Sequence, residues 1–126
     1  MRASNGYPEP YNVKYWSIGN ENYGSWELGA HTVNDWGPMV CESAKLLRSV
    51  TKDAKLFAAA TSDKNWTIPL LKAAGRQLDY ISLHGYWDAL AHYNNPSSFV
   101  ECMQRTDAPE QDIQKAIKLL DESGYG

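Results

Sequence analysis

Short apolar runs alternate along the chain with longer amphipathic segments. Residues 13–19 (VKYWSIG) are dense in β-branched and aromatic residues, which predicts a strand. Lys55–Ala60 (KLFAAA) is short and continuously apolar, and residues 79–84 (DYISLH) form the third predicted strand. A continuously apolar strand is typical of burial on both faces, as in a parallel sheet. The pattern therefore predicts three strands, with the second buried on both faces.

Two helices are predicted between these strands. The first runs from Thr32 or Asp35 to Val50: Thr32 and Asp35 have the capping-box spacing, whereas Pro38 fits better if Asp35 is itself the cap. The second covers residues 65–74 and is ended by Gly75. At helical spacing, one face of the first helix would hold Trp36, Val40, Leu47 and Val50.

Two more helices are predicted after the third strand. One covers residues 95–105, with Pro96 in its first turn. The other covers residues 107–123, with Asp107 as its cap and Gly124 at its end. The predicted buried stripe of this last helix is Ile113, Ala116, Ile117 and Leu120.

The order of elements predicts the fold class. Strands that alternate with helices indicate right-handed βαβ units, and hence an α/β fold with a parallel sheet. Three strands cannot close a barrel, and a complete (β/α)₈ barrel needs roughly 250 residues. The chain is therefore either a small open α/β domain or part of a larger one. Residues 1–11, rich in Pro, Gly and Asn, are predicted to be a loop or a cut end.

Composition narrows the classes of partner and compartment. The 126 residues carry a net charge of −3 and are 43% apolar, which argues against disorder and against nucleic acid or an anionic membrane as partner. No apolar run approaches the ~20 residues that span a bilayer, and the N-terminus has no apolar signal-peptide region. Cys41 and Cys102 lack metal-ligand or redox spacing, so we expect reduced thiols and a cytoplasmic location.

Candidate chemistry lies after the strands, because active sites of parallel α/β folds form at the carboxyl ends of the strands. Glu21 follows the first strand, and His84 and Tyr86 follow the third, so we expect them to face one mouth. Burial among aromatic rings would raise the pKa of the Glu21 carboxyl, allowing it to deliver a proton to a leaving oxygen. Cleavage of a glycosidic bond needs such an acid and a second carboxylate across the sugar.

Each of these residues also has a purely structural interpretation. Glu21 could be a surface loop carboxylate, Tyr86 a rim aromatic and His84 a structural residue at a strand end. His31 and His92 show no pairing that suggests a metal. The five Trp and eight Tyr suit a sugar-binding cleft, but most could equally be core or rim residues.

Two motifs carry a resemblance to a known family. Residues 13–21, V-K-Y-W-S-I-G-N-E, resemble the end of the fourth barrel strand in glycoside hydrolase family 51, the α-L-arabinofuranosidases. Residues 82–86, S-L-H-G-Y, resemble the signature of its sixth strand, and residues 44–62 are also similar. The resemblance implies that residues 1–126 form part of a (β/α)₈ TIM-barrel catalytic domain, about strands four to six with their helices.

The resemblance also implies roles. Glu21 would be the general acid/base, and Asn20 would hydrogen-bond the 2-hydroxyl of arabinose. Tyr86 would hydrogen-bond the nucleophile carboxylate, with His84 close by. Trp26 and Trp87 would form the cleft wall. The implied reaction is retaining and exo-acting on arabinan, arabinoxylan or arabino-oligosaccharides, without metal or cofactor.

One departure from the family pattern changes the expectation for this chain. The family's nucleophile Glu ends the seventh strand, and no Glu of this sequence fits that place, since Glu101, Glu110 and Glu122 lie in predicted helices. The isolated chain is therefore expected to be inactive, and the parent enzyme to be a homo-oligomer by family analogy. Two alternatives stay open: a clan member that acts on β-glucan or xylan, and a non-catalytic sugar-binding α/β module.

Overall fold

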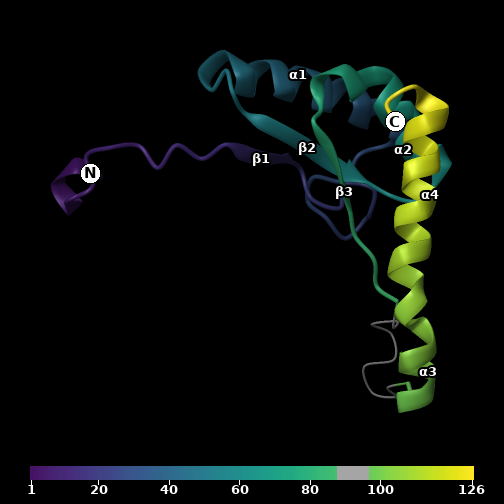
Figure 1. The fold of residues 1–126 in the computed structure, drawn as a ribbon. Helices are drawn as coiled ribbons and strands as arrows, with labels where there is room; N and C mark the ends of the chain where they lie inside the picture. Colours follow the sequence, from purple (N-terminus) through teal and green to yellow (C-terminus); the bar gives the residue numbers. More distant parts are fainter. Residues whose placement is uncertain (88–96) are drawn as a thin grey trace.

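Three parallel strands form the centre of the molecule (Figure 1). The computed structural model describes residues 1–87 and 97–126. Strands β1 (Tyr15–Ile18), β2 (Lys55–Ala60) and β3 (Tyr80–Leu83) pair in the order β1-β2-β3. Both pairings are parallel, so the predicted α/β class and all three predicted strands are confirmed. Residues 1–14 extend away from the sheet (Figure 1).

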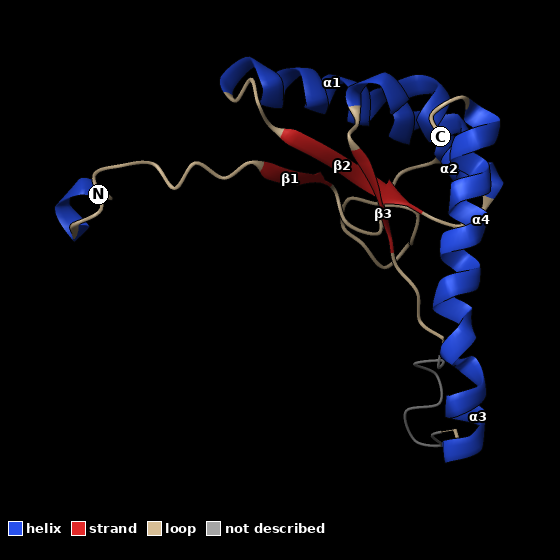
Figure 2. Ribbon diagram, viewed as in Figure 1, coloured by secondary structure: helices blue, strands red, loops and turns tan. Residues whose placement is uncertain are grey.

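Helices connect and flank the strands (Figure 2). They are α1 (Val33–Val50), α2 (Lys64–Ala74), α3 (Phe99–Gln104) and α4 (Ala108–Ser123). Short 3-10 turns cover Ala3–Asn5, Gly75–Gln77 and Arg105–Asp107. Helices α1 and α2 pack against each other, and α4 packs against α2.

The core lies between the central strand and the first two helices. Leu56, Ala58 and Ala60 alternate along one face of β2 and are fully buried. The small side chains of Ala58 and Ala60 let the helices pack closely against the sheet. The residues of α1 and α2 buried in the same cluster are Trp36, Val40, Ala44, Leu70 and Ala74.

The opposite face of the sheet is more open. Side chains paired in a parallel register share a face, which places Tyr15, Phe57 and Tyr80 together. Tyr15 is 62% exposed and Tyr80 52% exposed, although their rings lie 6.3 Å apart. Ala59, also on this face, is 1% exposed. The predicted burial of β2 on both faces therefore holds for much of this strand, while β1 and β3 are more exposed.

An ionic cluster joins the amino ends of β2 and β3 to α1. Asp79 accepts hydrogen bonds from Arg48 Nη2 at 2.9 Å, Lys55 Nζ at 2.7 Å and Leu56 N at 3.0 Å. Burial alone would raise the pKa of Asp79, but the hydrogen bonds from Lys55 and Leu56 and the charges of Lys55 and Arg48 outweigh it and lower the pKa. The ionised carboxylate thereby ties β2 to the start of β3.

Helix α1 begins after Thr32, one of the two starts that the sequence allowed, and ends at Val50 as predicted. Thr32 is the residue before the first turn, so Asp35 lies inside the helix and is not the cap. The Thr32 hydroxyl donates to Asp35 Oδ2 at 2.5 Å instead of capping backbone amides. Pro38 consequently lies inside the helix. At the far end, Val50 is 80% exposed, so it does not share the burial of Trp36 and Val40 on the predicted face.

The ends of α2 and α4 also correct parts of the prediction. Gly75 follows α2 but is right-handed (φ −54°), and its lack of a side chain is explained by the ring of Tyr125, which occupies the space of a Cβ. Asp107 precedes α4 without a side-chain cap bond, whereas Gly124 ends it in the left-handed region (φ 77°), as predicted.

The buried stripe of α4 is rotated from the predicted one. Ala116 and Leu119 are buried, while Ile113 and Ile117 are 52% and 44% exposed. Helical periodicity located the apolar positions, but contact with α2 decides which of them are covered. Within the described part of the chain, an apolar strip of α4 formed by Ile113 and Ile117 therefore remains exposed to solvent.

The predicted helix at 95–105 is shorter in the structure. Ser98 caps α3 through a capping box with Glu101. Pro96 and His92 lie outside the described residues. Cys41 and Cys102 are both free thiols, as expected. Among residues 1–87 and 97–126, no helix has the length and apolar character to cross a membrane.

Candidate active site

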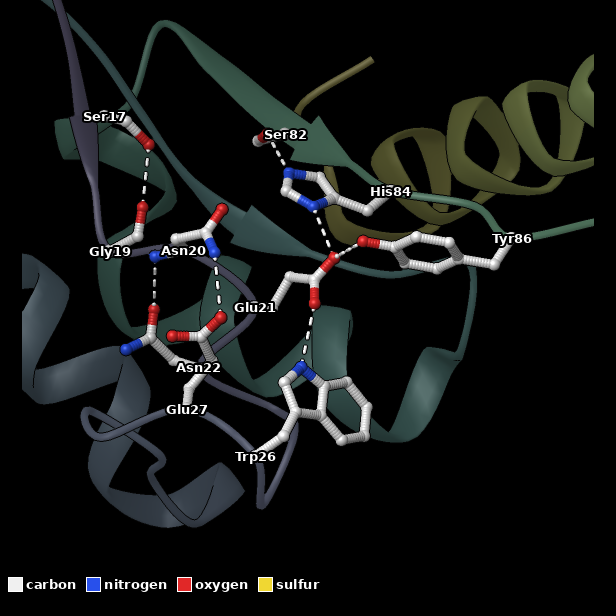
Figure 3. Close-up of polar contacts among 10 residues, drawn as sticks. All are labelled: Ser17, Gly19, Asn20, Glu21, Asn22, Trp26, Glu27, Ser82, His84 and Tyr86. Carbon is white, nitrogen blue, oxygen red and sulfur yellow. Dashed lines mark hydrogen bonds and ion pairs between the residues drawn. The ribbon is translucent and has the colours of Figure 1, made fainter. Parts of the chain in front are cut away.

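A sharp turn after β1 builds the candidate site. Gly19 has φ 74° and Glu21 has φ 45°, both in the left-handed region. A Cβ on Gly19 would overlap Asn22 Oδ1 and the ring of Trp36, so glycine is required by space as well as by backbone conformation. This turn brings the Glu21 side chain back over the carboxyl end of the sheet (Figure 3).

Asn22 holds the loop that follows in a fixed shape. Its Oδ1 accepts from the backbone N–H of Asn20 at 2.8 Å, and its Nδ2 donates to Gly29 O. Its backbone carbonyl accepts from His31 N at 2.8 Å. Asn22 is 7% exposed, so these bonds are shielded from water and stabilise the loop.

The Glu21 carboxylate receives three side-chain hydrogen bonds (Figure 3). Tyr86 OH donates to Oε1 at 2.8 Å, and His84 Nδ1 lies 2.8 Å from the same oxygen. Trp26 Nε1 donates to Oε2 at 2.8 Å. Glu21 is 5% exposed, so the carboxylate is nearly enclosed by partners. The predicted convergence of Glu21, His84 and Tyr86 on one mouth is confirmed.

The pKa of Glu21 is shifted downward, opposite to the direction expected from the sequence. The hydrogen bonds from His84, Trp26 and Tyr86 lower its pKa, and they outweigh burial, which acts in the opposite direction. An ionised carboxylate can only accept, so His84 Nδ1 carries a proton, while Ser82 Oγ lies 3.2 Å from His84 Nε2. The predicted rise in the pKa of Glu21 is therefore wrong for residues 1–126. Burial does raise this pKa, but the hydrogen bonds from the three donors lower it by more.

Aromatic rings connect this carboxylate to the core. Tyr23 packs edge-on against Trp26 at 6.3 Å and Trp66 at 5.8 Å. Burial, reinforced by the negative charge of Glu21, raises the pKa of Tyr23 to about 12. Trp36 stacks on Trp66, and the Nε1 groups of both donate to Ala59 O. The wall of the site is therefore continuous with the buried cluster.

Two predicted site residues take partners that the sequence did not indicate. Asn20 Nδ2 donates to Glu27 Oε1 at 3.0 Å (Figure 3). Trp87 donates through Nε1 to Asp112 Oδ2 on α4, at 3.1 Å. The hydrogen bond from Trp87 lowers the pKa of Asp112, assisted by those from Lys115 and Ser62.

Trp26 and Tyr86 also make contacts that their expected roles did not include. Trp26 is expected as a cleft wall, and in the structure its indole N–H also donates to the Glu21 carboxylate, while the residue as a whole stays 69% exposed. Tyr86 was expected to bond a second carboxylate and here donates to Glu21. Spacing from Glu21 could have suggested Trp26, Glu27 and Asn22 as loop partners, but nothing in the sequence links Asp112 to Trp87.

The chemistry available here is that of a carboxyl group among proton donors. The described residues contain no cluster of three or more His, Cys, Asp or Glu side chains able to hold a metal ion. A nearly buried carboxylate after a parallel strand, with Tyr, His and Trp donors around it, has the features of a glycoside hydrolase half-site.

Comparison with known proteins assigns the family. Residues 1–111 match the model of the Alpha-L-arabinofuranosidase 1 domain, so the chain belongs to the α-L-arabinofuranosidase family. It is 32% identical to an intracellular exo-α-(1→5)-L-arabinofuranosidase of Halalkalibacterium halodurans, over 94% of this chain and 26% of that protein. A protein of the same name from Acetivibrio thermocellus is 29% identical over 96% of this chain and 24% of its own length.

Solved structures agree. The α-L-arabinofuranosidase of Thermotoga maritima, in an arabinose complex, aligns with a TM-score of 0.85 and 30% identity over 98% of this chain and 24% of that one. The family 51 enzyme of Thermotoga petrophila aligns with a TM-score of 0.71 and 34% identity, over 96% and 24%. The chain thus spans about a quarter of the length of these relatives.

Proposed function

We propose that residues 1–126 are part of the catalytic barrel of a retaining, exo-acting α-L-arabinofuranosidase. They would supply about strands four to six of a (β/α)₈ barrel with their helices. The TM-score of 0.85 over 98% of the chain and the parallel order β1-β2-β3 support this placement. The half-exposed rings of Tyr15 and Tyr80, on the sheet face opposite the buried cluster, would then face the barrel interior.

The observation that carries the proposal is the Glu21 carboxylate with its three donors. We assign Glu21 as the general acid/base. In the first half-reaction it would protonate the leaving glycosidic oxygen while a second carboxylate, from polypeptide outside residues 1–126, attacks the anomeric carbon. In the second half-reaction Glu21, now ionised, would take a proton from the attacking water.

The two half-reactions make opposite demands on the Glu21 carboxyl. The present donors lower its pKa, which favours the ionised state that the second step needs. A second carboxylate ~5–5.5 Å away would raise the pKa through like-charge repulsion. Tyr86, whose O–H now donates to Glu21 Oε1, could redirect it to that second carboxylate and so remove one of the lowering contacts. Glu21 would then hold its proton for the first step.

Neighbouring residues would bind the sugar. Asn20 would hydrogen-bond the 2-hydroxyl of arabinose, and His84 would hold the orientation of Glu21 through its Nδ1. Trp26 and Trp87 would offer ring surface to the substrate, since both remain partly exposed. The substrate class would be terminal α-L-arabinofuranosyl groups of arabinan, arabinoxylan or their oligosaccharides, with no cofactor.

The cellular setting is also a proposal. Several relatives carry the word intracellular in their names. A reducing cytoplasm suits the two free thiols of Cys41 and Cys102. We extend the proposal to a homo-oligomeric parent enzyme, which size measurement on the full-length protein would test.

The test is a substrate panel on the full-length protein. We expect release of phenol from a phenyl α-L-arabinofuranoside, with the anomeric configuration of the first product retained in a proton NMR time course. Phenyl β-glucoside and β-xyloside should not be cleaved. Turnover of those two without the arabinofuranoside would replace the proposal by the β-glucan or xylan alternative. Saturable arabinose binding without any turnover would favour a sugar-binding module.

A further inference from the structure

We propose that Glu27 is a positioning residue that fixes which end of the Asn20 amide faces the substrate. The inference rests on the proposed function, since Asn20 matters only if a sugar binds beside Glu21. Glu27 lies seven residues beyond Asn20 in the same loop. The hydrogen bond between Asn20 Nδ2 and Glu27 Oε1, at 3.0 Å, is the starting observation.

An asparagine amide has a donating and an accepting end, and only its partners decide which way it turns. A carboxylate accepts hydrogen bonds, so Glu27 selects the orientation in which Nδ2 faces it. Turning the amide over would place Oδ1 against a carboxylate oxygen and leave two acceptors in contact. Figure 3 shows the resulting arrangement, with Asn20 Oδ1 on the side of the amide away from Glu27.

The backbone of Asn20 is held separately, so Glu27 acts on the side chain. Asn20 N donates to Asn22 Oδ1 at 2.8 Å, and this bond does not involve Glu27. Asn20 itself is exposed, and without a partner its amide could rotate freely in water. Glu27 is half-buried, so its carboxylate offers a more restricted and therefore better defined acceptor.

The consequence is a preference for a ligand group that donates. With Nδ2 turned toward Glu27, the Oδ1 on the other side of the amide is the atom that we expect to face a sugar, where it would accept from a hydroxyl next to the reacting carbon. The charge of Glu27 also reaches the site, because it contributes to raising the pKa of Tyr23 and of Tyr86. Glu27 is thus close enough to act on the site without being a catalytic residue.

The experiment compares three variants of the full-length protein on two substrates. Glu27→Met removes the acceptor at similar size, and Glu27→Gln keeps an acceptor oxygen. Glu42→Met, on the surface of α1, is the matched control. The substrates are phenyl α-L-arabinofuranoside and its 2-deoxy analogue, which lacks the hydroxyl that Asn20 would bind.

We expect Glu27→Met to lower kcat/KM about tenfold on the arabinofuranoside, the equivalent of one lost hydrogen bond, and less than twofold on the 2-deoxy analogue. Glu27→Gln and Glu42→Met should stay within about twofold of wild type on both. Equal losses on both substrates, or no loss for Glu27→Met, would overturn the inference. So would a loss in Glu27→Gln as large as in Glu27→Met.

A double substitution separates this inference from the proposed function. In an Asn20→Ala background, Glu27→Met should have no further effect, because the amide that it orients is gone. A further tenfold loss there would contradict the positioning role even in a correctly identified arabinofuranosidase. A wild-type protein that cleaves no arabinofuranoside would instead refute the proposed function itself.

Discussion

Replacing Gly19 by alanine should lower the free energy of unfolding by more than the strain of a positive φ alone would explain. Gly19 has φ 74°, which costs a non-glycine residue about 1 kcal/mol. The added Cβ would also overlap Asn22 Oδ1 and the Trp36 ring. Asn22 can move aside only by giving up its bonds to Asn20 N and Gly29 O, worth together about 1–3 kcal/mol. We expect Gly19→Ala to lower the free energy of unfolding by about 2–4 kcal/mol.

The chain provides a control for the backbone part of this effect. Gly124 has nearly the same φ, 77°, but among residues 1–87 and 97–126, its immediate chain neighbours aside, no atom lies within 4 Å of the place that a Cβ would take. Gly124→Ala should therefore cost only the strain, about 1 kcal/mol. Urea unfolding of the full-length protein measures both values under the same conditions.

The same substitution should impair catalysis, because the turn at Gly19 aims Glu21. Loss of the turn geometry would separate the Glu21 carboxylate from Tyr86 and His84, so kcat/KM should fall at temperatures where Gly19→Ala is still folded. The reasoning is refuted if Gly19→Ala costs no more than Gly124→Ala. It is also refuted if Gly19→Ala keeps wild-type kcat/KM.

Two further predictions concern charge. Trp26→Phe removes a donor to the Glu21 carboxylate, so the pKa of Glu21 should rise and the alkaline limb of the kcat/KM profile should move to higher pH; an unmoved limb would argue against the contact. Asp79→Asn should lower the free energy of unfolding by about 1–3 kcal/mol at pH 7. Because the folded pKa of Asp79 is lowered, wild-type stability from this group is present above its ordinary value of 3.8 and is lost as the pH falls through the folded pKa. The free energies of unfolding of wild type and Asp79→Asn should therefore converge as the pH is lowered from 7 to 2. A difference between the two that stays constant with pH would contradict the role of Lys55 and Arg48.

The sequence was sufficient to predict the main helices and strands and to locate the candidate site at the carboxyl ends of the strands. Strand and helix periodicities identify β2 and its neighbours, because the apolar run of β2 leaves few alternatives. The rule that parallel strands gather their carboxyl ends brings Glu21, His84 and Tyr86 together before any coordinates are known. Local signals were also enough for the end of α4, where Gly124 adopts the left-handed conformation.

What the sequence could not provide depends on distant contacts. The buried face of α4 is set by its packing against α2, and periodicity alone cannot choose between Ile117 and Leu119. The pKa of Glu21 depends on the balance between burial and three donors, and the sequence suggested only the burial. The hydrogen bond between Trp87 and Asp112 joins a residue after β3 to one on α4, 25 positions further along the chain, and no sequence motif predicts it.

The most direct test of Glu21 as acid/base uses Glu21→Ala in the full-length protein with two leaving groups. A phenyl α-L-arabinofuranoside needs protonation of its leaving oxygen, whereas a 2,4-dinitrophenyl arabinofuranoside does not. We expect kcat/KM to fall about 10²–10⁴-fold on the first and far less on the second. Added azide should accelerate turnover of the second and give an arabinofuranosyl azide of retained configuration. Equal losses on both substrates with no effect of azide would contradict the assignment.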